Sequence, residues 1–274
     1  GIAIFGTASV GGGNGFVGLM VSDNQMSSTE ATAVSYGILF ADGNWVNGFT
    51  EGYGTGLGSF GVYGNEIDRF SKSGIALKCN DLTGLVRTRI IENVSIVGNK
   101  VRAGTRTQQM YSIYAAVRAT AAQTSRVQSL YIRDNDIPDA KDSGIFFGVG
   151  DDGVGGAVFS HVRDIVISGN LIPSCEHTTS SVGIAFTNDC TDPGGILDYR
   201  DFDISDNVVG SGATADLPQV GIMTDFGDIA GSGLQDVSIC RNRLKAFQPD
   251  GTGVLDIRGV NLVSTGSIIN LKVK

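Results

Sequence analysis

The chain has 274 residues, with 40 glycines, 5 prolines and a net charge of −8. Abundant glycine without proline is typical of a fold with many tight turns, and it argues against collagen or a disordered chain. The acidic balance argues against nucleic acid as the main partner, because phosphate binding needs clustered Lys and Arg, and no apolar run is long enough to cross a membrane.

From residue 21 onward one short motif recurs seven times. In each copy an Asn stands three residues after a Val or Ile and two residues before another apolar side chain. The asparagines are Asn24, Asn65, Asn99, Asn135, Asn170, Asn207 and Asn242. Apolar and polar residues alternate on either side of the Asn, which is strand periodicity, and Asn itself is a good turn residue. Each copy therefore predicts a strand, a tight turn at the Asn and a second strand.

A second motif, Gly-Ile, follows the Asn on the next expected strand. Its copies begin at Gly37, Gly74, Gly144, Gly183, Gly221 and Gly253, and Ser112 stands in place of Gly in the third copy. Strands repeated at one period bury their apolar faces only by stacking on their neighbours, and stacked asparagines can pair amide to amide. The sequence therefore predicts an all-β parallel β-helix (a β-solenoid) with coils of about 35 residues.

The repeat runs through nearly the whole chain, so we predict a single domain over residues 1–274. Residues 1–20 are rich in glycine and weakly patterned. We expect them to form the opening coil or a cap, because the end of a solenoid needs cover. Residues 260–274 alternate like a strand but lack the full motif, which predicts a partial last coil, a cap or an oligomer contact.

Residues 41–61 form the most unusual insertion, because they hold the one Trp of the chain among several glycines. Trp45 and Tyr53 offer flat aromatic faces that suit sugar rings, and Glu51 lies between them in the sequence. We therefore expect these three residues to bind carbohydrate. The alternative is a third strand and a corner, with Trp45 packed inward.

Six residues before the Asn, the later coils carry a polar side chain, and in four of these five coils Arg or Gln stands directly before it. The polar residues are Asn93, Ser129, Asp164, Asp201 and Asp236. Carboxylates stacked about 4.8 Å apart repel each other, and the neighbouring Arg163 and Arg200 can offset this repulsion. The pattern predicts a solvated charge ladder. The two histidines, His161 and His177, indicate neither a catalytic triad nor a metal site.

Aspartates follow the Gly-Ile strand of three successive coils. They are Asp151 and Asp152, then Asp189 and Asp192, then Asp225 and Asp228. Because they leave the stack at equivalent places, we expect them to lie along one edge. Retaining glycosidases hold two carboxyl groups about 5 Å apart, and inverting ones about 6.5–9.5 Å apart. One coil step gives the first spacing, and two steps or a diagonal give the second.

We therefore predict that Asp189 with Asp225, or Asp151 with Asp189, is a catalytic pair. Sugar binding is predicted for Asp152, Asp192 and Asp228. Aspartate at strand ends is also ordinary turn chemistry, which stays the alternative. No metal ligand and no cofactor is predicted, although clustered carboxylates can hold Ca²⁺.

The Asn ladder, the Gly-Ile strands and the long coil resemble the right-handed parallel β-helices of the pectate-lyase-like group. The glycine-rich, loop-heavy coils look most like bacteriophage tailspike proteins, over about residues 16–260. This resemblance implies a homotrimer of parallel β-helices that binds a host surface polysaccharide, and many members cleave it by hydrolysis or elimination. It carries over no catalytic residue, since the chain has no Gly-His-Gly or Arg-Ile-Lys motif of the polygalacturonases.

Three functions stay open. The first is a tailspike-like domain on a virion tail or extracellular surface that binds and cleaves capsule or O-antigen, as a glycoside hydrolase or a lyase. The second is a receptor-binding or structural β-helix without catalysis, which an acidic column paired with Arg163 and Arg200 would favour. The third is a bacterial polysaccharide lyase or epimerase, which calcium beside an Arg or Lys would favour.

Overall fold

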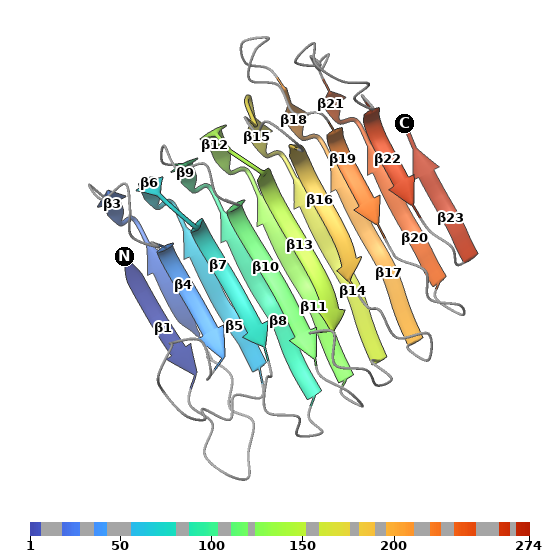
Figure 1. Cartoon of the computed structure of the whole chain (residues 1–274), viewed down its shortest axis with the longest axis horizontal. Coiled ribbons are helices and arrows are strands. Elements are labelled where there is room, and N and C mark those ends of the chain that lie inside the picture. The colour runs from blue at the N-terminus through green and yellow to red at the C-terminus, as the bar shows by residue number, and fades with distance from the viewer. Residues whose placement is uncertain are drawn as a thin grey trace.

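A computed structural model describes residues 1–6, 18–27, 36–42, 56–80, 88–103, 111–119, 124–151, 159–175, 181–189, 196–210, 220–225, 233–244, 258–263 and 267–274. These residues form strands, turns and bends, and among them there is no helix that could cross a membrane. Figure 1 shows the strands stacked side by side, with the N-terminus at one end of the stack and the C-terminus at the other. The predicted all-β parallel β-helix is confirmed.

The strands form three parallel sheets, and each coil contributes a strand to each sheet in turn. Sheet A consists of β1 (Ile2–Gly6), β4 (Tyr36–Asp42), β7 (Ser73–Asn80), β10 (Tyr111–Ala119), β13 (Ser143–Asp151), β16 (Val182–Asp189), β19 (Val220–Asp225) and β22 (Arg258–Val263). Sheet B consists of β2 (Leu19–Ser22), β5 (Gly56–Tyr63), β8 (Thr88–Val97), β11 (Thr124–Arg133), β14 (Phe159–Ser168), β17 (Ile196–Ser205), β20 (Gly233–Cys240) and β23 (Ser267–Val273). Sheet C consists of β3 (Gln25–Ser27), β6 (Glu66–Phe70), β9 (Lys100–Ala103), β12 (Asp136–Asp139), β15 (Leu171–Ile172), β18 (Val208–Val209) and β21 (Arg243–Leu244).

The asparagines stand at the turn between sheet B and sheet C, as predicted, and form an Asn ladder through the coils. In the middle of the ladder, Nδ2 of Asn99 donates to Oδ1 of Asn135 at 3.0 Å and to the carbonyl oxygen of Val62 at 2.9 Å. The backbone N–H of Asn99 donates to the same Oδ1 at 3.0 Å. Each inner asparagine therefore satisfies backbone groups of neighbouring coils, which an apolar residue cannot do.

The residue before each ladder asparagine has a positive φ. These residues are Asp23, Gly64, Gly98, Asp134, Gly169, Asp206 and Arg241. Glycine adopts this left-handed conformation without strain and Asp tolerates it. The two-residue turn therefore needs both a left-handed residue and the Asn amide.

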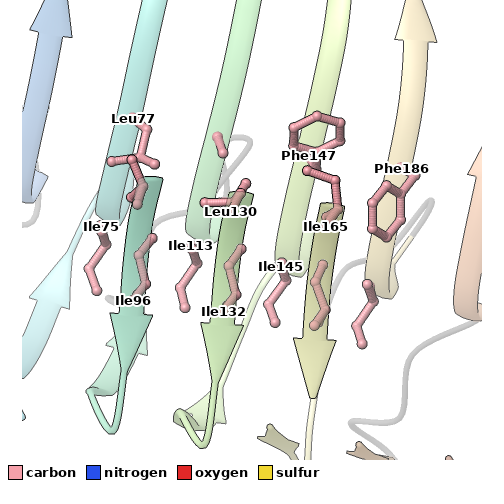
Figure 2. Close-up of a cluster of buried hydrophobic side chains, with 14 of the residues drawn as sticks. Ile75, Leu77, Ile96, Ile113, Leu130, Ile132, Ile145, Phe147, Ile165 and Phe186 are labelled. Carbon is pink, nitrogen blue, oxygen red and sulfur yellow. The ribbon is translucent and has the colours of Figure 1, made fainter. Parts of the chain in front are cut away.

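The Gly-Ile motif fills the core from sheet A. Ile38, Ile75, Ile113, Ile145, Ile184, Ile222 and Val260 occupy one register column. Figure 2 shows Ile75, Ile113 and Ile145 at matching positions on successive strands, beside Ile96 and Ile132 from sheet B. All five side chains are fully buried in one cluster. Burying an isoleucine stabilises the fold by roughly 1.5–3 kcal/mol, so these columns supply much of the stability of the stack.

The glycine of the motif leaves room for the Asn motif of the next coil. A Cβ on Gly183 would lie 2.3 Å from Cγ1 of Val209, which stands two residues after Asn207. Gly37, Gly74 and Gly144 meet Ile67, Val101 and Ile172 in the same way. The two motifs are therefore the two halves of one packing contact.

Two ends of the repeat differ from the prediction. Ile2 pairs with Ile38, so Gly1 and Ile2 are a further copy of the motif that the sequence reading missed. The last copy was placed at Gly253, but Val260 pairs with Ile222, so Gly259 and Val260 take that place. That part of the prediction was wrong, and residues 245–257 lie outside the described residues.

The polar column in sheet B has a backbone cause. Its members all have a positive φ, and so do Gly18 in the first coil, Ser59 in the second and Asn270 in the last. The backbone pairing between neighbouring strands of sheet B skips this column. Arg163 pairs with Arg200, and the next pair is Ile165 with Phe202. The sheet B strands from β5 onward therefore each have one left-handed residue at this position, where short polar side chains cost least.

The arginines beside this column do not neutralise it. Arg163 and Arg200 both donate to Asp198, which lies two residues before Arg200. Asp164 instead accepts hydrogen bonds from Oγ of Ser129 at 2.8 Å and from the hydroxyl of Tyr131 at 2.6 Å. Arg163 and Arg200 are therefore paired with Asp198 rather than with Asp164 of the polar column.

Candidate functional site

Sheet A carries an aromatic cluster on the face that points away from the core. Along β10 and β13, Tyr114 and Phe146 alternate with the core residues Ile113, Ala115, Ile145 and Phe147. The rings of Tyr114 and Phe146 stack with centroids 5.3 Å apart and an angle of 8°, and Tyr111 lies 4.7 Å from Phe146. The three rings are half-buried. The sequence reading did not identify these aromatic rings, because other positions of the same register column hold small residues. Ala76 pairs with Tyr114, and Ala185 pairs with Phe146.

A buried lysine lies at the edge of this aromatic cluster. Lys78 is 3% exposed, and its Nζ donates to the hydroxyl of Tyr36 at 2.9 Å. The same Nζ lies 4.8 Å from the ring centroid of Tyr36 and 5.2 Å from that of Tyr114, which is cation–π distance. Burial raises the pKa of Tyr36 to about 12, so Tyr36 is protonated and uncharged at neutral pH.

Gly148, two residues after Phe146 on β13, leaves the space that the ring of Phe146 occupies. A Cβ on Gly148 would lie 2.7 Å from Cε1 of Phe146. Gly148 pairs with Thr187 on β16, and Thr187 pairs with Asp225 on β19. This register column therefore leads from the aromatic cluster to one of the predicted catalytic residues.

The three aspartates predicted to be catalytic end neighbouring strands of sheet A, where the structure describes their backbone. Asp225 pairs with Thr187, so Asp189 lies two residues further along its strand than the partner of Asp225. Asp189 in turn pairs with Gly150, so Asp151 lies one residue beyond that pair. The three positions are staggered, and the expectation that they are equivalent is wrong.

The stagger distinguishes between the two predicted pairs. With a rise of about 3.3 Å per residue and a strand spacing of about 4.8 Å, the Cα atoms of Asp189 and Asp225 are about 8 Å apart. Positions two residues apart share a face of a sheet, whereas consecutive positions belong to opposite faces. The register therefore favours Asp189 with Asp225 over Asp151 with Asp189.

The remaining predicted site residues lie outside the described residues. They are Trp45, Glu51, Tyr53, Asp152, Asp192 and Asp228. Their role in binding carbohydrate stays a prediction.

Within the described part of the chain, no group of three or more His, Cys, Asp or Glu side chains could hold a metal ion. Cys175 and Cys240 are buried free thiols, and burial raises the pKa of the Cys175 thiol well above its ordinary value. Neither thiol is therefore suited to act as a nucleophile.

Comparisons with protein-family models, with curated proteins and with solved structures find no match to this chain.

Proposed function

We propose that this β-helix binds a polysaccharide along the outer face of sheet A and hydrolyses it between Asp189 and Asp225. The observation that carries the proposal is the register of these two aspartates, which share a face at a diagonal separation of about 8 Å. This is a separation of Cα atoms, and two Asp side chains on one face at that spacing can hold their carboxyl groups about 6.5–9.5 Å apart, as inverting glycosidases do.

The aromatic cluster gives the same face a means of holding sugar. Phe146 pairs with Ala185, and Ala185 pairs with Met223, two residues before Asp225. The Cα atoms of Phe146 and Asp225 are therefore about 12 Å apart along the sheet. This distance exceeds one sugar ring, so a glycan of several sugars is needed to contact Phe146 and Asp225 together.

The chemistry of the pair is that of inverting hydrolysis. One carboxylic acid gives its proton to the glycosidic oxygen as the bond from the anomeric carbon breaks. The other, as a carboxylate, takes a proton from a water molecule that adds to the opposite face of that carbon. The step needs no cofactor, because water is the only co-reactant.

The resemblance to tailspike proteins extends the proposal to biology. It adds a capsule or O-antigen of a host cell as the substrate, a virion tail or extracellular surface as the location, and a homotrimer as the assembly. A fold by itself does not give a function, so each of these has its own test. Light scattering coupled to size exclusion gives the mass of the assembly, and a monomer at micromolar concentration would contradict the trimer.

The central experiment measures release of reducing ends and of unsaturated uronates from a panel of capsular and O-antigen polysaccharides. Asp189→Asn and Asp225→Asn keep the side-chain shape and remove the carboxylate. Each should lower the rate by about 100-fold or more, which is the usual share of general acid–base catalysis. Asp136→Asn, on β12 in sheet C, is the matched control and should leave the rate unchanged.

The other outcomes contradict specific parts of the proposal. Activity retained in both variants would reject the site. Products that absorb as unsaturated uronates would show elimination, in favour of a lyase. Binding without release across the panel would reject catalysis and favour a receptor-binding or structural β-helix. Phe146→Ala should weaken binding in every case where sugar lies on sheet A.

A further inference from the structure

A cluster of basic side chains lies on the outer face of sheet B, separate from the face that carries Asp189 and Asp225. We call it the arginine cluster. It comprises Arg126 and Gln128 on β11, His161 and Arg163 on β14, and Asp198 and Arg200 on β17. These strands lie side by side in Figure 1 and pair in register.

The register places the cluster in two short columns. One column holds Arg126, His161 and Asp198, and the other holds Gln128, Arg163 and Arg200. The residues between the columns, Val127, Val162 and Tyr199, are buried in the core. Since side chains alternate along a strand, both columns face away from the core.

Asp198 joins the second and third strands of the cluster. It accepts hydrogen bonds from Nη2 of Arg163 and Nε of Arg200, and Nδ1 of His161 lies 3.3 Å from its Oδ2. Burial acts to raise the pKa of Asp198, but the hydrogen bonds from Arg163, Arg200 and His161 lower it to about 2. The carboxylate is therefore ionised at neutral pH.

The cluster keeps an excess of positive charge around this carboxylate. The cluster holds three guanidinium groups and one carboxylate, and Glu92 on β8 borders it as the register partner of Gln128, so one positive charge remains without counting His161. Arg163 and Arg200 are 46% and 44% exposed at the side chain. Each guanidinium has five N–H donors, and Arg163 and Arg200 each use one on Asp198. Most of these donors therefore remain for a ligand.

The arginine cluster also borders a hollow. A depression of about 240 Å³ is lined by Arg126, Val127, Gln128, His161 and Arg163. Guanidinium forks bind carboxylate, sulfate and phosphate groups through two parallel hydrogen bonds. The hollow thus offers basic and polar walls, with the backbone of Val127 between Arg126 and Gln128.

We propose that the arginine cluster is a binding subsite for the anionic substituents of an acidic polysaccharide. The inference rests on the proposed function, because a glycan chain is the ligand that it takes. The oxyanion is a carboxylate, sulfate or phosphate carried on a sugar, and the paired guanidinium groups of Arg163 and Arg200 are its main donors. Anionic groups repeated along a glycan can then contact Arg126 and Arg163 on neighbouring strands.

The width of the arginine cluster favours a sugar chain over a nucleic acid duplex. The cluster spans three strands, so it is only about 10 Å wide. A duplex needs a broad basic surface, whereas a single sugar ring with one anionic substituent fits this width.

The test measures binding to immobilised polysaccharides by biolayer interferometry. The probes are polygalacturonate, dextran sulfate, neutral dextran and a double-stranded oligonucleotide. The wild type should bind the two acidic glycans, and salt at about 0.5 M should weaken the binding by screening. The double variant Arg163→Gln/Arg200→Gln should bind about tenfold more weakly for each arginine removed, since charge-assisted hydrogen bonds are strong.

Two further variants separate binding from folding and from net charge. Arg133→Gln removes one positive charge from the same strand as Arg126 but outside the cluster, and it should bind as the wild type does. Asp198→Asn removes the carboxylate that competes with the ligand, so it should bind acidic glycans several-fold more tightly. A gain of binding cannot come from a misfolded protein. Purely structural ion pairs would give no gain.

The outcomes differ from those of the hydrolysis test. Arginine-dependent binding of acidic glycans without cleavage supports this inference and rejects the hydrolysis. Cleavage by the wild type, together with unchanged binding in the arginine variants, supports the hydrolysis and rejects this inference. Equal binding to neutral dextran would overturn recognition of an anion, and equal arginine-dependent binding to the oligonucleotide would overturn the assignment to a glycan.

Discussion

Replacing Asn135 by alanine removes a rung from the middle of the Asn ladder. Asn135 is 1% exposed. Its Nδ2 donates to the carbonyl oxygen of Ile96 at 3.0 Å and to Oδ1 of Asn170 at 2.9 Å. Its Oδ1 accepts from the backbone N–H and from Nδ2 of Asn99, both at 3.0 Å. Alanine makes none of these four bonds.

The cost follows from the groups that lose a partner. The backbone N–H of Asn99 and the carbonyl oxygen of Ile96 stay buried without these bonds. A buried polar group left unsatisfied costs about 1–3 kcal/mol, so Asn135→Ala should lower the free energy of unfolding by about 2–6 kcal/mol. Domains are stable by only about 5–15 kcal/mol, so the loss is a large fraction of the total.

Urea unfolding followed by far-UV circular dichroism measures this loss through the transition midpoint and its slope. Asn24→Ala is the matched control, because Asn24 ends the ladder and its bonds to Ser22 and Asn65 are only partly buried. Water can replace those bonds, so the control should lose about 1 kcal/mol or less. Equal losses in the two variants, or a loss below about 1 kcal/mol for Asn135→Ala, would refute the role given to the ladder.

Three further predictions test other features of the coil. Gly183→Ala places a methyl group 2.3 Å from Cγ1 of Val209, so it should destabilise the fold by about 1–3 kcal/mol in urea unfolding, whereas an unchanged midpoint would contradict the packing between the two motifs. Asp201 has a φ of 58°, so Asp201→Val should cost about 1–2 kcal/mol and Asp201→Gly should not; equal effects would show that charge rather than backbone selects the residue. The pKa of Asp198 is lowered from 3.8 to about 2, so its contribution to stability is present above about pH 4 and is lost as the pH falls toward 2. Acid titration of the thermal midpoint should show a smaller fall in Asp198→Asn than in the wild type, and identical titrations would show that the ion pairs do not couple to folding.

The sequence predicted those parts of the fold that repeat with the same chemistry. Asn99 and Asn135 were recognised because their amide is needed at every turn, and Gly183 because every coil needs the same gap. The copy at Gly1-Ile2 was missed because no Asn motif precedes it in the sequence. The last was misplaced because Gly253-Val254 and Gly259-Val260 read alike, and strand pairing alone distinguishes them.

The polar residues of sheet B were predicted to occupy equivalent positions, but the reason given for that equivalence was wrong. Asp164 and Asp201 were recognised as equivalent, but the reason is a positive φ, which an amino-acid pattern does not distinguish from a preference for solvent. The stagger of Asp189 and Asp225 was missed because it depends on register between strands joined by long loops. Asp198 was not singled out because its arginine partners come from two strands.

The Asn ladder also has a consequence for how this protein can change in length. Successive rungs are 41, 34, 36, 35, 37 and 35 residues apart in sequence, yet each makes the same amide bond. The ladder is therefore indifferent to how much chain lies between two turns. The side-chain amide of each asparagine donates to the asparagine of the next coil toward the C-terminus. Every asparagine from Asn65 onward therefore offers the same Oδ1 acceptor to the one before it. A duplicated coil would meet compatible partners on both sides, and such a molecule can grow by whole coils, in evolution or by engineering, while its loops diverge freely.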